Sequence, residues 1–194
     1  MSGRAGACAQ RRGFAPVLDA GVRVLVLGSF PSPASLAARQ YYGHPRNQFW
    51  PILGEILSES LSAMAYPQRL ERLLAHGVGL WDVFTACERA GSLDSEIRAA
   101  RPSDLTRLPQ LAPRLRAVAF NGRVAGRFQP DIAELGYASA VLPSTSPAHA
   151  ARRLEQKLAL WKDFFQAWCE SGSRFKLKRL IRSSPCLANE PRIP

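Results

Sequence analysis

The apolar residues of this chain follow two patterns, short unbroken runs and longer stretches with a helical period. A continuous apolar, β-branched run at 22–30 predicts a strand buried on both faces, and three further strands are predicted at 78–84, 115–122 and 138–147. Helical spacing and helix-end residues occupy most of the chain between and after these runs. Because strands that alternate with helices form parallel sheets covered on both faces, the pattern predicts an α/β fold.

The predicted helices lie at 47–61, 67–77, 103–111, 123–136 and about 148–169. Asn47 is placed to cap the first helix, Gly77 to end the second and Pro130 to interrupt the fourth. The Pro- and Ser-rich segment after the first strand is expected to be a loop. The last helix carries an apolar stripe that is typical of core, formed by Leu154, Leu158, Trp161, Phe165 and Trp168.

The chain has 194 residues, of which 46% are hydrophobic, and this is enough for one domain with its own core. We expect a single domain at 22–170, an N-terminal extension at 1–21 and a flexible basic tail at 171–194. The sequence has no apolar run of about 18 residues and no signal-peptide pattern, and its cysteines are too scattered for a disulfide framework. These features predict a cytoplasmic protein, and we expect it to associate with the bacterial nucleoid.

The formal net charge of +11 and a pI near 10.4 favour a polyanionic partner such as DNA. Residues 171–194 hold six basic residues against Glu190, or +5, which leaves +6 for the rest of the chain. Of the 26 basic residues 22 are arginine, and an arginine-rich composition can also reflect nucleotide bias in a gene. Charge alone therefore leaves a merely basic surface as an alternative to nucleic-acid binding.

Several common chemistries have no signal in this sequence. There is no GxGxxG, no GxxxxGK[ST] and no GxSxG, which argues against dinucleotide binding, P-loop phosphate binding and a nucleophile-elbow hydrolase. The three histidines lack metal-ligand spacing, so we expect no metal and no other cofactor. All four lysines lie in the last helix or the tail, away from the strand ends, which leaves a Schiff-base mechanism without an obvious nucleophile.

In open parallel sheets the ligand crevice lies beyond the carboxyl ends of the strands. The segments that fall there are GSFPS (28–32), WDV (81–83), FNG (120–122) and LPSTSPAH (142–149), with the aromatic stretch YYGHPRNQFW (41–50) behind the first. Together they resemble the uracil-DNA glycosylase superfamily from about residue 22 to 168. The HPRNQFW segment makes the chain most similar to the hypoxanthine-DNA (deoxyinosine) glycosylase branch.

This resemblance implies a three-layer α/β/α sandwich with a four-stranded parallel sheet. It also implies a monofunctional DNA glycosylase of base excision repair, which flips a deaminated base out of double-stranded DNA and hydrolyses its N-glycosidic bond. We expect hypoxanthine as the first substrate, a monomeric enzyme and no cofactor.

The same resemblance implies roles for individual residues. Asn47 is similar to the residue that holds the attacking water, and Tyr42 to the aromatic on which the base stacks. The alternatives are that Asn47 only caps a helix and that Tyr42 is plain core. The rest of the expected base pocket consists of Gly28, Ser29, Phe30 and Asp82.

Two of these pocket positions depart from the uracil enzymes. Phe30 stands where many relatives have an Asp or Asn that acts on the water, and Asp82 stands where they have an asparagine that reads the base. An ionised aspartate only accepts hydrogen bonds, which suits the N1–H of hypoxanthine. The alternative is that Asp82 caps the next turn.

The second loop is expected to grip DNA. Its small hydroxyls and amides suit the phosphates beside the lesion, while Pro147 is expected to press into the vacated stack. A plain turn is the alternative. The expected DNA-binding residues are His44, Arg46, Ser144, Thr145, Ser146, Pro147 and His149.

Three other functions stay open at this point. The same fold could excise uracil from G·U mismatches, or it could recognise lesions without cutting, given Phe30 in the first motif. A serine hydrolase that uses Ser144 or Ser146 with His149 is the weakest alternative, because no acid is evidently paired with them.

Overall fold

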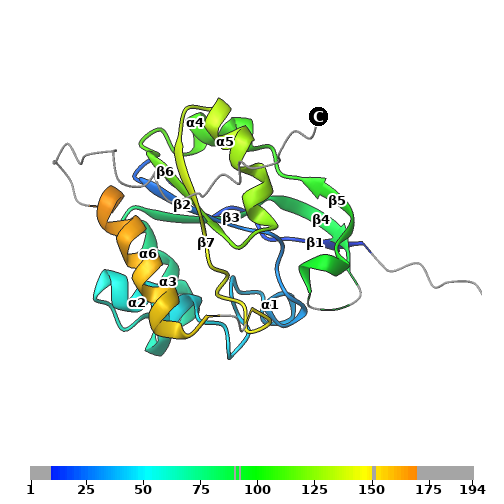
Figure 1. The fold of residues 1–194 in the computed structure, drawn as a ribbon, viewed down its shortest axis with the longest axis horizontal. Helices are drawn as coiled ribbons and strands as arrows, with labels where there is room; N and C mark the ends of the chain where they lie inside the picture. The colour runs from blue at the N-terminus through cyan, green and yellow to red at the C-terminus, as the bar shows by residue number, and fades with distance from the viewer. Residues whose placement is uncertain (1–9, 90, 92, 150–151, 170–194) are drawn as a thin grey trace, which may run out of the picture.

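The computed structural model describes residues 10–89, 91, 93–149 and 152–169. A four-stranded sheet lies at its centre, in the order β3-β2-β6-β7, and every neighbouring pair is parallel (Figure 1). The strands are β2 (Val24–Gly28), β3 (Val78–Asp82), β6 (Ala117–Asn121) and β7 (Ala138–Leu142). All residues of β2, β3 and β6 are buried, which explains why their sequences are unbroken apolar runs.

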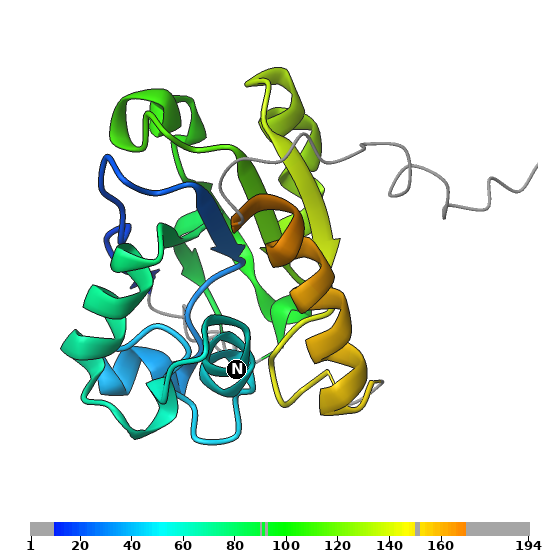
Figure 2. The same cartoon turned by 90° about the vertical axis from the view of Figure 1, so that its left-hand side faces the viewer.

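The sheet separates two hydrophobic cores, so the predicted α/β/α sandwich is confirmed. Successive side chains of a strand point to opposite faces, and β2 accordingly sends Val24 and Val26 into one core and Leu25 and Leu27 into the other. The first core is covered by α2 (Phe49–Leu57), η1 (Leu61–Ala63), α3 (Tyr66–Ala75) and α6 (Leu154–Cys169), the last of which is drawn in orange across the sheet in Figure 2. The second core is covered by η3 (Leu105–Arg107), α4 (Leu108–Leu111), η4 (Ala125–Phe128) and α5 (Gln129–Glu134).

A second, antiparallel sheet adjoins the first and was not expected. It consists of β1 (Arg11–Arg12), β4 (Phe84–Glu88) and β5 (Arg98–Pro102), in the order β1-β4-β5, with the short helix η2 (Asp94–Glu96) between β4 and β5. These strands are short, and β5 is largely exposed and polar, so no apolar pattern marks them. The β4–β5 connection lies beside the carboxyl end of β3, where it takes part in the candidate site.

The N-terminal segment packs against this domain. Arg11 and Arg12 pair with Cys87 and Ala86 of β4, and Val17 exchanges backbone hydrogen bonds of 2.8 and 3.0 Å with Leu80 of β3. Part of the expected extension at 1–21 therefore contributes strand pairing. The basic tail at 171–194 lies outside the described residues and stays a prediction.

The helices differ from their predicted bounds in several places. The helix predicted at 47–61 ends as α2 at Leu57, and the one predicted at 103–111 is divided into η3 and α4. The segment expected to be a loop contains α1 (Pro33–Ala38), which Ser32 caps by accepting a hydrogen bond of 3.2 Å from Ser35 N–H. The helix predicted at 123–136 is divided into η4 and α5, and Pro130 stands in the first turn of α5, where a missing N–H does no harm.

The last helix also differs, because it begins at Leu154 rather than near residue 148. Its stripe is buried at Trp161 and Phe165 but not at Leu154, which is 36% exposed because the segment before it is a loop. Among the described residues, no helix combines the length and apolar character that a membrane crossing requires.

Candidate functional site

A cavity of about 580 Å³ opens at the carboxyl ends of the four parallel strands. The strand register brings these ends together, because Gly28 is opposite Asp82 and Asn121 is opposite Leu142. Of the expected site residues, the ones that line the cavity are Gly28, Ser29, Phe30, Tyr42, Asn47, Asp82, Ser144, Thr145, Ser146 and His149. His44, Arg46 and Pro147 are not among its lining residues.

The floor of the cavity is formed by Gly28 and Asp82. A side chain at residue 28 would collide with Asp82 Oδ1 and approach the Tyr42 hydroxyl to 3.3 Å, so only glycine fits there. The Asp82 carboxyl is 4% exposed, and its buried Oδ2 has no hydrogen-bond partner within the described part of the chain. Burial, followed by the nearby charge of Asp94, raises the pKa of Asp82 to about 7.

This environment bears on the alternative role of Asp82 as a turn cap. No backbone N–H among the described residues donates a hydrogen bond to its carboxyl, and the side chain faces the cavity. Ser103 instead bonds the Asp82 backbone carbonyl, at 2.7 Å. An acid with a pKa near 7 in a cleft is a feature of functional sites.

Tyr42 forms a wall of the cavity and also belongs to the core. Its ring stacks on Phe49 with centroids 3.8 Å apart and planes inclined by 22°, so one ring face is covered. Its backbone φ of +56° is uncommon for a residue other than glycine and is held by the surrounding loop. Burial, followed by the Asp82 charge, raises the pKa of the hydroxyl, and nearby Asn121 opposes this rise.

Asn47 stands at the cavity wall one residue before the N-cap of α2, which is Gln48. Its Oδ1 accepts a hydrogen bond of 3.0 Å from Phe49 N–H, so the side chain does satisfy a donor of the first turn. No described protein group accepts a hydrogen bond from Nδ2. The capping contact is thus present, and it holds the amide at the cavity rather than away from it.

The second loop is held by Thr145, which is fully buried. Thr145 N–H donates to Asn121 Oδ1 and Asn121 Nδ2 donates to Thr145 Oγ1, both at 2.9 Å. The Thr145 carbonyl accepts from Gln48 N–H at 3.0 Å. The expectation that Thr145 grips phosphate is corrected, because its amide and hydroxyl are engaged inside the protein.

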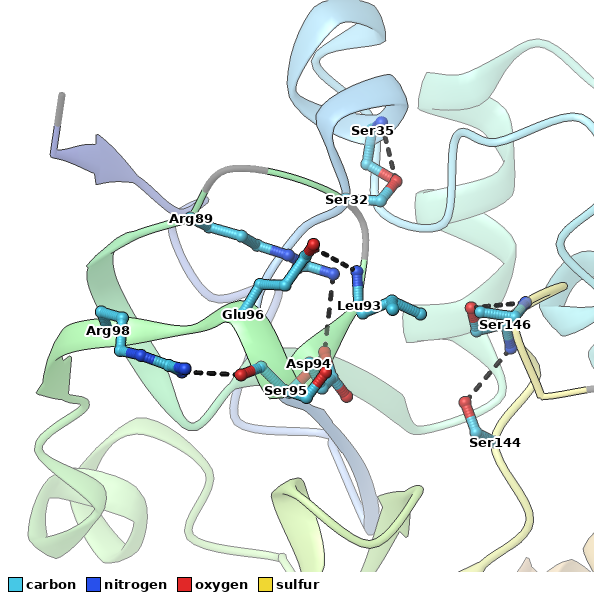
Figure 3. Close-up of polar contacts among 12 residues, drawn as sticks. Ser32, Ser35, Arg89, Leu93, Asp94, Ser95, Glu96, Arg98, Ser144 and Ser146 are labelled. Atoms are coloured by element: carbon cyan, nitrogen blue, oxygen red, sulfur yellow. Dashed lines mark hydrogen bonds and ion pairs between the residues drawn. The ribbon is translucent and has the colours of Figure 1, made fainter. Parts of the chain in front are cut away.

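The two serines beside Thr145 are oriented by hydrogen bonds within the loop. Ser144 Oγ accepts from Ser146 N–H at 3.2 Å, and Ser146 Oγ accepts from Ala148 N–H at 3.3 Å (Figure 3). The loop amides expected to be available at 146 and 148 are therefore occupied. Both hydroxyls still line the cavity.

His149 ends this loop. Burial lowers the pKa of its imidazole, and the charges of Lys157, Arg123 and Arg152 act in the same direction. Its buried Nδ1 has no hydrogen-bond partner among the described residues, and neither Ser144 nor Ser146 bonds the ring. The serine-hydrolase alternative therefore has no Ser–His pair in this part of the chain.

His44 and Arg46 lie on the loop before α2, outside the cavity. His44 Nδ1 accepts a hydrogen bond of 3.1 Å from Arg46 N–H, which shapes the turn between them. Arg46 is exposed.

Eleven of the lining residues were not among the expected site residues. Arg89, Leu93 and Asp94 come from the β4–β5 connection (Figure 3), and no periodic signal in the sequence predicts that connection. Arg89 is 3% exposed and forms an ion pair of 3.7 Å with Asp94. The Asp94 carboxylate also accepts a hydrogen bond of 2.8 Å from the Ser29 hydroxyl. Asn121 and Arg123 follow the third predicted strand, so the FNG segment did carry a signal for them.

The arrangement can hold a planar polar ring against Tyr42, read its edge at Asp82 and place a water at Asn47. Lysine is absent from the lining, and the described residues contain no cluster of three side chains suited to a metal ion.

Comparison with known proteins agrees with this geometry. Residues 15–168 match the family model "Uracil DNA glycosylase superfamily". A "Hypoxanthine DNA glycosylase" of Methanosarcina acetivorans is 42% identical, over 80% of this chain and 98% of the relative. Another of the same name, from Methanosarcina barkeri, is 39% identical over 81% and 99%.

A solved structure has the same fold. It is the solution NMR structure of a "putative Uracil DNA glycosylase" from Methanosarcina acetivorans, with a TM-score of 0.72, 40% identity and coverage of 80% of this chain and 98% of that one. The family match spans both cores and all four parallel strands. The chain therefore belongs to the uracil-DNA glycosylase superfamily.

Proposed function

We propose that this protein is a monofunctional DNA glycosylase that excises deaminated bases, hypoxanthine first, from double-stranded DNA. The observation that carries the proposal is one cavity lined by Tyr42, Asp82 and Asn47, three side chains suited to stacking, reading and hydrolysing a flipped nucleotide. The two relatives named hypoxanthine DNA glycosylase, at 42% and 39% identity, support the choice of base.

Asp82 is the group we assign to the base edge. Its ionised carboxylate accepts a hydrogen bond from N1–H of hypoxanthine, and its neutral acid can in addition donate to O6. A pKa of about 7 makes both forms accessible near neutral pH. Tyr42 supplies the stacking surface on the ring face that Phe49 does not cover.

Asn47 is the group we assign to the water. The transition state of N-glycosidic hydrolysis resembles an oxocarbenium ion, so the reaction needs a well-placed water more than a strong nucleophile. The Phe49 N–H bond fixes the Asn47 amide, and its Nδ2 and the second lone pair of Oδ1 are suited to orient a water.

Contacts to the DNA backbone are assigned to the rim of the cavity. Ser144, Ser146, Arg123 and His149 line the cavity and are the groups we assign to these contacts. Pro147 is assigned to the vacated stack, while His44 and Arg46 are assigned to phosphates farther along the strand. The basic segment 171–194 would strengthen binding at low salt, and a monomer at the nucleoid stays our expectation.

Uracil is the second candidate substrate, because of Asp82. In its neutral form this carboxyl offers one donor and one acceptor, the same pair that an asparagine amide presents to uracil O4 and N3–H. Excision from G·U mismatches by the same site is therefore the alternative.

The test uses duplexes with a single hypoxanthine, uracil or xanthine, incubated with the full chain and then cleaved with alkali at abasic sites. We expect cleavage to be fastest with hypoxanthine, and an undamaged duplex of the same sequence is the control. Faster release of uracil would favour the alternative. Tight binding to lesion DNA without any cleavage would instead identify a non-catalytic recognition protein.

A further inference from the structure

Lys157 is a buried cation that the assigned site does not use. It lies on α6, is 2% exposed and is one of the largest fully buried side chains in the described part of the protein. Its place in the last helix suggested a position away from the site, but the fold brings its ammonium group against two loops of the cavity. Burial lowers the pKa of this group.

The contacts of Lys157 join these two loops. Nζ donates a hydrogen bond of 2.8 Å to Oε1 of Gln48, the residue next to Asn47. It donates a second hydrogen bond, of 3.0 Å, to the carbonyl of His149. Both hydrogen-bond partners are thus neutral oxygens, and within the described residues no carboxylate lies within 4.0 Å of the ammonium group. A buried charge with neutral partners is expensive, so packing alone is a poor reason for a lysine here.

Neighbouring contacts make the link specific. Trp161, one turn farther along α6, donates a hydrogen bond of 3.0 Å to the carbonyl of Pro143 at the start of the second loop. Lys157 bonds the carbonyl of His149 at the end of the same loop. Gln48 in turn donates its backbone N–H to Thr145 in the middle of that loop. Helix α6 therefore fastens the second loop at both ends and ties it to the segment that carries Asn47.

We propose that Lys157 is a positioning residue for base excision, which sets the spacing between the Asn47 loop and the loop at 143–149. This inference rests on the proposed function, because it concerns the water and the strand that those loops hold. Lys157 does not line the cavity, so it acts through Gln48 and the His149 carbonyl and not on the substrate. A displacement of about 1 Å between reacting groups can lower a rate by about a hundredfold.

The experiment compares Lys157→Met, Lys157→Arg and the matched control Lys162→Met, an exposed lysine on the same helix. Single-turnover excision at saturating protein is measured on the hypoxanthine duplex, together with DNA affinity and the folded fraction. We expect Lys157→Met to lower the rate per folded molecule about tenfold or more. Lys157→Arg should recover part of that loss, and Lys162→Met should match the unmodified chain.

A double-mutant cycle with Gln48→Met tests the route of the effect. If Lys157 acts through Gln48, the double variant loses little more than Lys157→Met alone, whereas independent roles give additive losses. Gln48→Met removes the Lys157–Gln48 hydrogen bond while the lysine stays in place. It therefore tests the proposal even if Lys157→Met does not fold. The proposal is overturned if either single variant excises at the unmodified rate, or if the losses add. An unmodified chain that is inactive on every base would instead refute the proposed function.

Discussion

Asn121 and Thr145 are joined by two hydrogen bonds of 2.9 Å, one from each side. The amide of Asn121 stands at the end of β6 and accepts from the backbone of Thr145 while it donates to the Thr145 hydroxyl. This pair fixes the loop after β7 to the central sheet, and Gln48 attaches the α2 segment to the same threonine. Three separate segments of the cavity thus meet at one buried residue, Thr145.

Thr145→Val should therefore destabilise the protein, because it leaves the buried Asn121 Nδ2 without its acceptor. The expected loss in free energy of unfolding is about 1–3 kcal/mol, measured by urea denaturation. Thr106→Val makes the same chemical change at an exposed residue and should alter stability by about 0.5 kcal/mol at most. Equal losses in the two variants would contradict the role of the pair.

Asn47→Ala should abolish excision but retain binding to hypoxanthine DNA, since it removes the amide that holds the water and leaves Tyr42 and Asp82 in place. Loss of the Phe49 N–H acceptor should also cost about 1 kcal/mol of stability. Asn47→Asp keeps this acceptor and is the control for stability. A variant with normal excision and only a lower melting temperature would show that Asn47 acts as a cap alone.

The product of the reaction should be an intact abasic strand. Lys157 is the one lysine whose contacts reach the described site segments, and its ammonium group is turned to Gln48 and His149 rather than to the cavity. Borohydride added during excision should consequently trap no covalent protein–DNA adduct, whereas a bifunctional glycosylase provides the positive control. A trapped species would mean that an amine attacks the sugar.

Stability should fall as pH rises toward 7, because of Asp82. Its carboxyl has a pKa of about 7 in the folded chain against 3.8 for an ordinary aspartate, so between these values the folded state binds more protons than the unfolded state. The contribution is present below about pH 4 and is lost by about pH 7. Asp82→Asn should remove this part of the pH dependence, as followed by the denaturation midpoint from pH 4 to 8. An identical pH profile in the variant would refute the raised pKa.

The pH dependence of excision should reveal which form of Asp82 reads the base. Its charge interacts with Asp94 and with the hydroxyls of Tyr41, Tyr42 and Tyr66, and an assay from pH 6 to 8.5 spans the Asp82 pKa of about 7. If the neutral acid binds the N1–H and O6 edge, single-turnover rates fall as pH rises through about 7. Asp82→Asn supplies a donor and an acceptor at every pH and should give a flat profile over this range. Loss of hypoxanthine excision in this variant would show that the ionised carboxylate is required.

The sequence by itself determined the central architecture of this protein. An unbroken apolar run such as Val24–Leu27 can be satisfied only between two covering layers. The three buried strands β2, β3 and β6, which alternate with helical segments, therefore favour a parallel sheet in a sandwich. The same logic placed Gly28, Asp82 and Asn121 at one edge, because parallel strands end together.

Only the tertiary structure decided those features that depend on contacts between residues far apart in the sequence. The strands β1, β4 and β5 are short, and they form because their backbone groups find partners across the chain, which no local period reveals. Thr145 faces inward because Asn121 lies opposite it, although its sequence suits an exposed phosphate-binding loop equally well. Lys157 reaches Gln48 across 109 residues, since helix α6 packs over the sheet beside α2. Polar side chains of this kind take their roles from whichever groups burial brings within hydrogen-bond distance.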